Sequence, residues 1–503
     1  MTPFSAQHIE LARTDVPRQP GARGDGVAFP QLDGRRSTTR TLRAVLADAA
    51  GAIDPALEQS VLGCEGWRSD YVELLHELTA ACGRSPEAAT AAADAGLASM
   101  RSRLVFERAG SERPLERALE TIEPNAAHGT GVIAGTAPPV RELRVPYRGR
   151  ELQGKELREQ LARWVDGGVV EPSFAQAIEL VAENPDWLAL AGRTVVLVGA
   201  GAELAPLQPL CAWGARVAAI DLPVPAIAER VGAIARAGAG EVIVPLDGDG
   251  GQGADIAHAL PEVHRWLDGL PGERPLVLGM YAYADGGRHV TASGAFDVLA
   301  TRMLDARPDT ALAFLATPTD AYLAPPEAIA AARDAYAARR LRRPLQAPLK
   351  LVSRGRLFAP AYRADDRVAD VLIKQQGPNY AIAKRLQRWR GVLTAREHRV
   401  SFNVAPASWT RSVTKNRVLG AAYASAHRHG IEIFSADTSR VLMAAMLVHD
   451  LHRPGRTGGH PEALFSDSAA HGGLWRAAYE PRSVLGFAAF VGLPGALVGR
   501  GRR

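Results

Sequence analysis

Short apolar runs alternate with helix-like segments along the chain from residue 193 onward. The runs are rich in Val, Ile, Leu and Ala, and most are separated by stretches whose apolar residues recur at helical spacing. They are TVVLVGA (194–200), ARVAAID (215–221), GEVIVPLD (240–247), RPLVLGMYA (274–282), TALAFLAT (310–317), PLKLVS (348–353) and HRVSFNVAP (398–406). This alternation predicts an α/β fold, with a doubly wound, mainly parallel sheet covered by helices on both faces.

The first part of the chain has a different pattern. Residues 38–122 are dominated by Ala, Leu, Glu and Arg in amphipathic stretches, and helix-like segments return at 155–190. A Gly/Pro-rich connection (125–139) and a stretch that alternates like a strand pair (141–153) lie between them. We therefore expect an additional N-terminal α-helical domain. The expected parts are a flexible tail (1–36), the mainly helical domain (37–190), the α/β domain (191–455) and an irregular C-terminal segment (456–503).

Composition and charge exclude several classes of function. A formal charge of +5 over 503 residues, with no block of like charges, argues against a nucleic-acid partner. Cys64, Cys82 and Cys211 show no CxxC pairing and no neighbouring histidines, so we expect no metal site and a cytoplasmic protein. The uncharged stretch 483–499 is too short, and too interrupted by Gly and Pro, for stable membrane insertion to be expected.

Gly199 and Gly201 lie where the first predicted strand turns toward a helix. Without side chains, both positions let backbone N–H groups approach a phosphate, and a helix N-terminus favours negative charge there. Asp221 ends the next strand, where a carboxylate accepts hydrogen bonds from a ribose diol, which favours NAD over NADP. The pattern predicts a Rossmann-like nucleotide site, with Leu204 at the third glycine position of GxGxxG. Many S-adenosylmethionine methyltransferases have a similar turn and acid, so both interpretations stay open.

Tyr380 and Lys384 lie four residues apart in NYAIAKRLQRW (379–389), so both face the same side of a predicted helix. A phenol has a pKa of about 10 in water. A neighbouring ammonium group lowers that pKa, which lets the tyrosine act as an acid or base near neutral pH. The same ammonium group can hydrogen-bond a nicotinamide ribose. The spacing predicts an acid–base pair, and the alternative is an ordinary surface helix.

The region from 193 to about 440 resembles the short-chain dehydrogenase/reductase family. The glycine turn, Asp221, VPLDG with Asp247, YAIAK, and HRVSFNVAPASWTRS with Pro406 and Thr410 follow one another in the family's order. The resemblance implies that Tyr380 is the proton donor and that Lys384 holds the ribose and assists it. The cofactor-binding residues that it implies are Gly199, Gly201, Ala202, Asp221, Leu222, Asp247, Lys384, Pro406 and Thr410.

The chain departs from the family's pattern in two places. GMYAYADGG (279–287) replaces the Asn-Asn-Ala-Gly of the family and supplies no asparagine. The family also has a catalytic serine shortly before the tyrosine. We take Ser353, 27 residues before Tyr380, as its counterpart, since Thr317 and Thr319 end an earlier strand.

The function expected from these patterns is an NAD(P)-dependent oxidoreductase with a small-molecule substrate. It would transfer a hydride to or from a carbonyl or alcohol, with the Tyr/Lys pair moving the proton. A methyltransferase would leave that pair idle, and a non-catalytic nucleotide-binding protein would need only the glycine turn. The family often pairs its subunits through helices, so the resemblance also implies a homo-oligomer.

Overall fold

A seven-stranded sheet forms the centre of the computed structural model, which describes residues 25–272, 274–339, 348, 351, 353, 357–453 and 459–498. The six parallel strands are β9 (Thr194–Val198), β10 (Arg216–Ile220), β11 (Glu241–Leu246), β12 (Leu276–Met280), β13 (Ala311–Ala316) and β16 (Val400–Val404). The sheet order is β16-β13-β12-β9-β10-β11-β6. Counted along the chain, the parallel strands therefore lie in the order 3-2-1-4-5-6, which is the order of a Rossmann-type sheet. The expected doubly wound, mainly parallel sheet is confirmed.

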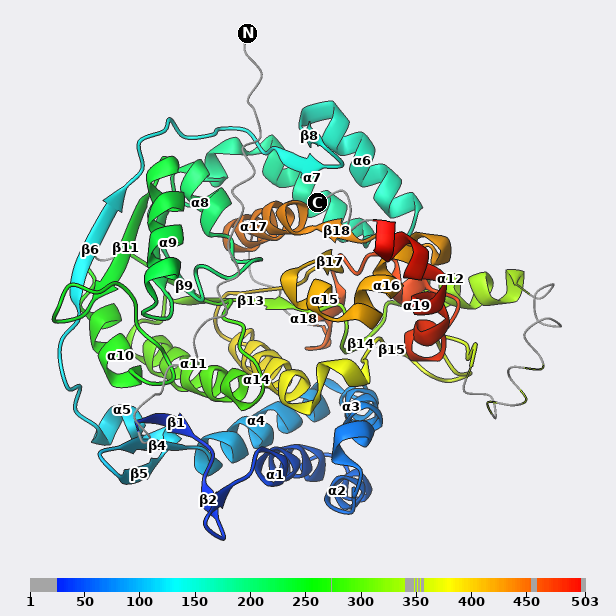
Figure 1. Cartoon of the computed structure of the whole chain (residues 1–503), viewed down its shortest axis with the longest axis horizontal. Helices are drawn as coiled ribbons and strands as arrows, with labels where there is room; N and C mark the ends of the chain where they lie inside the picture. Colours follow the sequence, from blue (N-terminus) through cyan, green and yellow to red (C-terminus); the bar gives the residue numbers. More distant parts are fainter. Residues whose placement is uncertain are drawn as a thin grey trace.

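The seventh strand, β6 (Gly129–Ala134), was not expected. It pairs antiparallel with β11 along the outer edge of the sheet, with Ile133 opposite Val242 (left in Figure 1). The prediction of a plain connection at 125–139 is wrong here. Two of the six residues of β6 are glycines with weak strand propensity, and the open edge of β11 supplies the pairing that decides their conformation.

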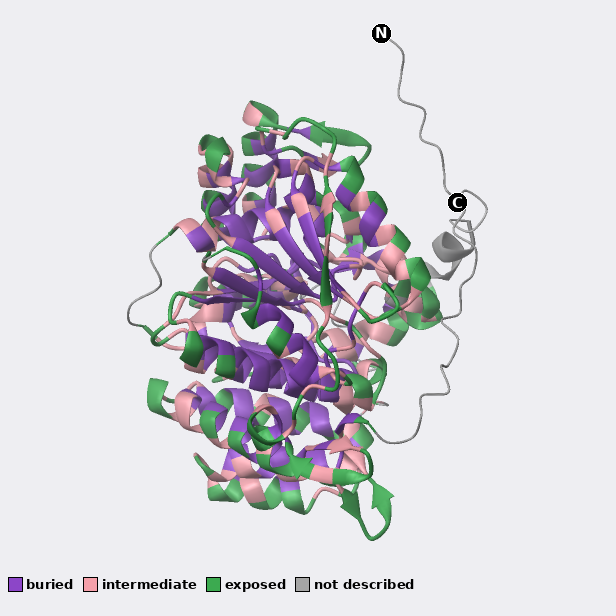
Figure 2. Cartoon of the chain, turned by 90° about the vertical axis from the view of Figure 1, so that its left-hand side faces the viewer, coloured by how far each residue is buried: buried purple, intermediate pink, exposed green. Residues whose placement is uncertain are grey.

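Alternate residues of the central strand face two different hydrophobic cores. Val196 and Val198 of β9 belong to the core on one face of the sheet, whereas Val195 and Leu197 belong to the core on the other. Successive side chains of a strand point to opposite faces, so a strand buried on both sides must be apolar throughout. Figure 2 shows this buried sheet between layers of helices.

Helices cover both faces of the sheet (Figure 1). The first core is formed with α10 (Leu260–Asp268), α11 (Gly287–Ala306) and α14 (Pro378–Thr394). The second core is formed with α6 (Gly154–Asp166), α7 (Pro172–Glu183), α8 (Leu207–Trp213), α9 (Pro225–Ala237) and α17 (Ala436–His452).

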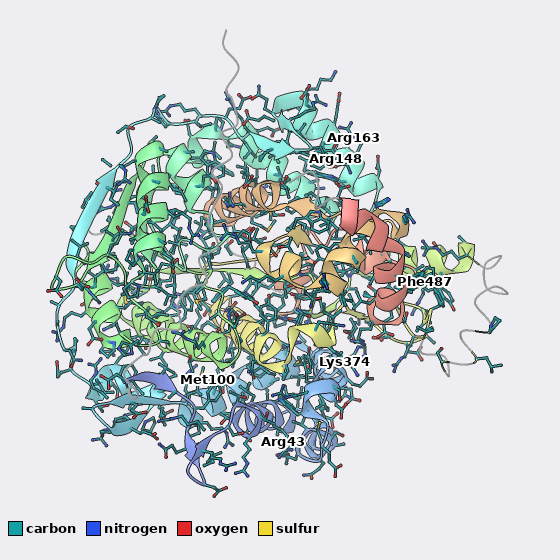
Figure 3. All side chains as sticks on the ribbon, viewed as in Figure 1. Arg43, Met100, Arg148, Arg163, Lys374 and Phe487 are labelled. Atoms are coloured by element: carbon teal, nitrogen blue, oxygen red, sulfur yellow. The ribbon has the colours of Figure 1, made fainter. Side chains whose placement is uncertain are left out.

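The N-terminal helices form a further layer below α11 and α14. They are α1 (Thr38–Gly51), α2 (Pro55–Leu62), α3 (Trp67–Cys82) and α4 (Pro86–Arg103). Figure 3 shows Met100 on α4 in this layer. At Gly96, a Cβ atom would lie 2.4 Å from the ring of Trp389 on α14, so a glycine is needed for the two helices to approach. The buried residues of α1 to α4 belong to the same core as α11 and α14, so an N-terminal domain with a core of its own is not confirmed.

The C-terminal part of the chain adds helices beside the sheet edge formed by β16. These are α12 (Pro326–Ala338), α15 (Arg411–Lys415), α16 (Arg417–Ser425), α18 (Ala463–Ser466) and α19 (Pro481–Val498). α16 and α19 pack against each other (right in Figure 1). The segment expected to be irregular thus contains an 18-residue helix. Among the described residues, no helix combines the length and apolar character that crossing a bilayer requires.

Short elements connect these layers. One small sheet has three strands, β1 (Gly26–Ala28), β4 (Val105–Arg108) and β5 (Ser111–Pro114). The two-stranded sheets are β2 (Gln31–Leu32) with β3 (Arg35–Arg36), β7 (Val145–Tyr147) with β8 (Arg150–Leu152), β14 (Ala321–Leu323) with β15 (Val368–Asp370), and β17 (Ser408–Trp409) with β18 (Phe434–Ser435). The remaining turns of helix are α5 (Ala118–Thr121), η1 (Leu115–Arg117), η2 (Pro185–Trp187), η4 (Lys374–Gln376), η5 (Ala426–His429) and η6 (Leu474–Arg476). Of the expected tail, residues 1–24 lie outside the described residues. Of the strand expected at 348–353, only residues 348, 351 and 353 are described, and the central sheet does not include them.

Candidate active site

The carboxyl ends of three neighbouring strands bring the predicted motifs to one edge of the sheet. β9 ends at the glycine turn, β12 at the loop 281–286, and β13 just before Thr317. The strand order changes direction between β9 and β12, and ligands of doubly wound sheets bind at such a point. The edge that carries the glycine turn is therefore the place to look for a site.

Gly199 allows the ends of β9 and β12 to approach each other. Its φ of +84° lies in the left-handed region, and its N–H donates to the Ile220 carbonyl oxygen at 2.8 Å. A Cβ atom at this position would lie 2.3 Å from the Cα atom of Ala282. Because Ala282 immediately precedes Tyr283, the glycine turn lies against the loop that carries the aromatic cluster described below.

Asp221 follows the end of β10 and lies against the glycine turn. The Gly201 N–H donates to Oδ2 of Asp221 at 2.7 Å, and the Leu222 N–H donates to Oδ1 at 2.8 Å. Burial raises the pKa of Asp221 above its usual range, and these two backbone hydrogen bonds oppose the rise. The carboxylate predicted to bind a ribose thus lies at the glycine turn, where both of its oxygens accept backbone N–H groups.

Arg230 of α9 adds a positive charge to the same corner. A Cβ atom at Gly201 would lie 2.8 Å from Nη2 of Arg230, and Nε of Arg230 is buried without a hydrogen-bond partner among the described residues. A guanidinium group with an unpartnered N–H beside a glycine fits a phosphate group. The corner therefore fits the anionic part of a nucleotide, and it offers a carboxylate and a guanidinium group side by side.

The turn after β9 is longer than the sequence pattern predicts. The Ala202 N–H donates to the Gly199 carbonyl oxygen at 2.9 Å, and α8 begins only at Leu207. The carboxylate of Glu203 accepts the Arg411 N–H at 2.9 Å, which ties the turn to the segment just after Thr410. The helix therefore does not begin at Gly201, because five further residues precede its first residue.

The other predicted cofactor residues lie after the ends of outer strands. Asp247 follows β11, where its carboxylate accepts the N–H groups of Asp249 and Gly251. Pro406 follows β16, and its carbonyl oxygen accepts the Ser408 hydroxyl at 2.7 Å. These contacts are local, so the roles of Asp247, Pro406 and Thr410 in holding a cofactor stay predictions.

Tyr380 lies at the start of α14, the helix that leads from the fifth to the sixth parallel strand. Its ring stacks on His289 with centroids 5.4 Å apart, and it contacts Tyr283 at 5.9 Å. Burial raises the pKa of Tyr380, and the neighbouring Thr317 side chain opposes that rise. The sequence predicted the opposite direction, with Lys384 lowering the pKa. That prediction is wrong for the protein alone, because desolvation of the phenol dominates.

Lys384 lies one turn further along α14, and its ammonium group points into the protein interior. Nζ donates to the Leu315 carbonyl oxygen and to Oε1 of Gln387, each at 3.1 Å. Gln387 in turn donates to the Ser293 hydroxyl at 3.1 Å. Burial lowers the pKa of Lys384 to about 8. The lysine can therefore gain or lose its proton close to neutral pH.

His289 completes the aromatic cluster from α11. Its Nδ1 accepts the Ala284 N–H at 3.1 Å, so the ring proton of the neutral imidazole resides on Nε2. Nε2 is buried and has no hydrogen-bond partner among the described residues. Burial, together with the positive charge of Lys384, lowers the pKa of His289 to about 3. His289 is thus a neutral ring with one unused donor beside Tyr380.

The hydroxyl group next to Tyr380 belongs to Thr317. Thr317 follows the end of β13, and its Oγ1 is 2.7 Å from Oγ1 of Thr319, which also accepts a hydrogen bond from Gln376 at 2.8 Å. Ser353, the serine chosen from the sequence, accepts the Leu357 N–H at 3.0 Å in the segment between α12 and β15. A catalytic role for Ser353 stays a prediction.

The sequence did not predict roles for His289, Tyr283 and Gln387. His289 and Tyr283 have no motif of their own, and only their place directly after β12 pointed to the sheet edge. Gln387 follows Lys384 by three residues, so helical spacing alone could have paired them. Thr317 was noted as a strand end, but its pairing with Tyr380 depends on how β13 and α14 pack.

No protein-family model matches the sequence, and a search of curated proteins finds no match. Among solved structures, the chain is similar to the crystal structure of an oxidoreductase of the short chain dehydrogenase/reductase family from Burkholderia thailandensis. The identity is 14% and the TM-score 0.32, with 57% of this chain and 94% of that chain covered. A likeness of this size carries no argument about activity or cofactor.

Proposed function

We propose that this protein is an oxidoreductase that interconverts an alcohol and a carbonyl compound with a nicotinamide dinucleotide. The observation that carries the proposal is the position of Tyr380. It lies at the carboxyl edge of a Rossmann-type sheet, beside the side chain of Thr317, with Lys384 one helical turn away. The loop after β12 joins this cluster directly to the glycine turn.

The proton transfer follows from the groups around Tyr380. In the direction of reduction, the Tyr380 hydroxyl would donate its proton to the carbonyl oxygen of the substrate while the carbonyl carbon receives a hydride. In the reverse direction, the phenolate would take the alcohol proton. Thr317 would hold the substrate oxygen. Lys384 would stabilise the phenolate that remains once its ammonium group turns from the Leu315 carbonyl oxygen and Gln387 toward Tyr380.

The cofactor would be held at the corner formed by Gly199, Gly201, Asp221 and Arg230. When bound, a nicotinamide dinucleotide supplies or accepts the hydride. Asp221 favours a free ribose diol, as in NAD, whereas Arg230 favours a 2′-phosphate, as in NADP. The corner therefore supports a nicotinamide cofactor of either type, and the preference for NAD expected from Asp221 alone depends on where Arg230 points when the ligand binds.

A second candidate function is a non-catalytic nucleotide-binding protein. It is favoured by the hydrogen bond from Gly201 to Asp221, which occupies a backbone N–H group that a bound diphosphate would need. In such a protein the corner would open and close with the nucleotide, and Tyr380 would serve only as part of the core.

Thermal unfolding in the presence of candidate ligands tests the proposal. NAD⁺, NADH, NADP⁺, NADPH and S-adenosylmethionine would each be added at increasing concentration. A ligand present at 100 times its Kd stabilises the folded state by about 2.7 kcal/mol. We expect a rise in Tm with at least one nicotinamide cofactor, and a rise with S-adenosylmethionine alone would contradict the proposal.

Turnover then separates the two candidate functions. A panel of ketones and secondary alcohols would be assayed at 340 nm with the cofactor that binds. Reduction or oxidation by the wild type supports the enzyme. Cofactor binding without turnover of any compound in the panel favours the non-catalytic protein.

A further inference from the structure

An apolar cavity lies next to the candidate active site, under the helix pair α16 and α19. Its volume is about 90 Å³, roughly six to nine times the space that one buried water needs. Its walls come from both helices, from the loop residues before β18, from the segment that precedes η4, and from η6 with the residues after it. Among the lining residues that the structure describes, the polar ones are Thr319, Arg339 and His429, besides the phenols Tyr423 and Tyr479.

The polar residues that line the cavity come from different helices and loops. Thr319 comes from the loop after β13, beside the sheet edge that carries the candidate active site. Arg339 comes from the end of α12, where its guanidinium group lies over the ring of Tyr479, and His429 comes from the end of η5. The rest of the wall is built from Ala, Val, Leu, Ile, Pro and Tyr, so water inside it finds few hydrogen-bond partners.

Two observations join this cavity to Tyr380. Thr319 lines the cavity, and its hydroxyl group is hydrogen-bonded to that of Thr317, whose side chain lies beside Tyr380. Tyr423 of α16 also lines the cavity, and it is close enough to Tyr380 to contribute to the rise in the pKa of that residue. A molecule whose oxygen lies at Tyr380 and Thr317 would thus have the cavity next to it.

Small side chains on the two helices leave this space open. Ala422 of α16 and Ala488 of α19 both line the cavity, and the Ser425 hydroxyl donates to the Ala488 carbonyl oxygen at 2.8 Å, which holds the helices together. On the outer side of α19, Phe487 contacts Phe358 at 5.6 Å (right in Figure 3). Phe487 is nevertheless 46% exposed, so this side of α19 faces solvent, whereas Ala488 faces the cavity.

We propose that this cavity binds the apolar part of the substrate, so that the substrate class is an uncharged, hydrocarbon-bearing ketone or secondary alcohol. This inference rests on the proposed function for the position of the reacting oxygen, whereas binding of the apolar group depends only on the cavity. Each CH₂ group moved from water into such a space raises affinity about fourfold.

A chain-length series with a cavity-filling variant tests the inference. The probes are 2-butanone, 2-hexanone and 2-octanone. Ala422→Phe places a phenyl ring in the cavity, and Ala488→Phe does so from the facing helix. Val418→Phe is the matched control, because Val418 lies on α16 but is 44% exposed. Circular dichroism confirms that each variant is folded, and Ala488→Phe replaces Ala422→Phe if that variant is not.

Binding is measured first, without turnover, by saturation-transfer NMR of 2-octanone. We expect a signal with the wild type and Val418→Phe, and a signal reduced at least tenfold with the filled variant. No signal with the wild type, or an equal signal with the filled variant, would overturn the inference. If the cavity binds 2-octanone but no cofactor supports turnover, the proposed function fails and the apolar ligand site stands.

The kinetic arm uses the cofactor identified by thermal unfolding. For the wild type and Val418→Phe, kcat/KM should rise about fourfold per CH₂ from 2-butanone to 2-hexanone. For the filled variant, that rise should vanish while 2-butanone is reduced at a similar rate. A chain-length dependence that is unchanged in the filled variant would place the hydrocarbon elsewhere.

Discussion

The side chains of Thr317 and Tyr380 lie next to each other although they come from different elements, the end of β13 and the start of α14, and Thr317 opposes the rise in the pKa of the phenol. This contact places the phenol at the carboxyl edge of the sheet, beside the residue that directly follows β13. It also offers two hydroxyl groups to the same point in space. That pair, rather than Tyr380 with Ser353, is the arrangement on which the proposed chemistry depends.

Replacing either hydroxyl group tests this arrangement. Tyr380→Phe removes the proton donor, and we expect kcat to fall about 10²- to 10⁴-fold, the usual contribution of a general acid. Thr317→Val removes the second hydroxyl group with little change in volume, and kcat should fall by a smaller factor. Both variants should bind the nicotinamide cofactor as the wild type does, measured by the shift in Tm.

The control for these variants is Tyr283→Phe, which keeps the ring contact with Tyr380 but removes a hydroxyl group that is not hydrogen-bonded to Thr317. Its kcat should stay within about threefold of the wild type. Wild-type turnover by Tyr380→Phe would remove this residue from the mechanism.

The two glycines of the turn should respond differently to alanine. Gly199→Ala places a Cβ atom 2.3 Å from the backbone of Ala282 at a φ of +84°, so the fold must shift, and we expect a loss of more than about 2 kcal/mol. Gly201→Ala meets mainly the flexible end of Arg230 at 2.8 Å, so stability should change little. Urea unfolding measures both, and equal losses would contradict this view of the turn.

Gly201→Ala should nevertheless weaken the cofactor. The new methyl group occupies the space between the turn and Arg230, where we place the diphosphate. The Kd of the nicotinamide cofactor, from titration of protein fluorescence, should rise at least tenfold. An unchanged Kd would mean that the nucleotide does not approach Gly201.

The sequence predicted the sheet well because its parallel strands are buried on both faces. Val195, Val196, Leu197 and Val198 form a continuous apolar run of the kind that only such a strand requires. It missed β6, whose glycines carry no apolar pattern, since the conformation there is decided by the neighbouring strand.

The candidate site was predicted only in part, for a related reason. Tyr380 and Lys384 are four residues apart, so helical geometry alone brought them together. The partners that set their pKa values, Thr317, His289 and Gln387, depend on tertiary packing and burial that no local spacing reveals. The same burial explains why the pKa of Tyr380 is raised when the sequence suggested that it is lowered.

Asp297 of α11 should be essential for holding the N-terminal helices to the rest of the fold. Its carboxylate accepts hydrogen bonds from Arg101 of α4 at 2.7 Å and from Arg390 of α14 at 2.6 Å, and its side chain is 2% exposed. Asp297→Asn leaves two guanidinium groups without their anion, and loss of one partner of a buried ion pair costs about 3–5 kcal/mol. Urea unfolding measures this cost.

The matched control is Glu120→Gln, which breaks an exposed ion pair with Arg117 in the same part of the chain. Exposed pairs contribute about 0–1 kcal/mol, so this variant should unfold close to the wild type. Similar losses in the two variants would show that burial of Asp297 does not strengthen its contacts.

Lys384 should reduce the stability of the fold at neutral pH. Its pKa is lowered by burial to about 8 from 10.5, so between these values the unfolded chain binds more protons than the folded one. The free energy of unfolding therefore rises with pH between about 8 and 10.5. The cost of burying the charged ammonium group is fully present below pH 8. Lys384→Met removes the buried cation and keeps the length of the side chain. Its Tm should exceed that of the wild type most at pH 7, and the difference should shrink toward pH 10, while turnover is lost.

Lys374→Met, on an exposed lysine of η4 (Figure 3), should change Tm little at any of these pH values. A Tm difference for Lys384→Met that stays constant from pH 7 to 10, measured by calorimetry, would contradict the role of burial in setting the charge of this residue.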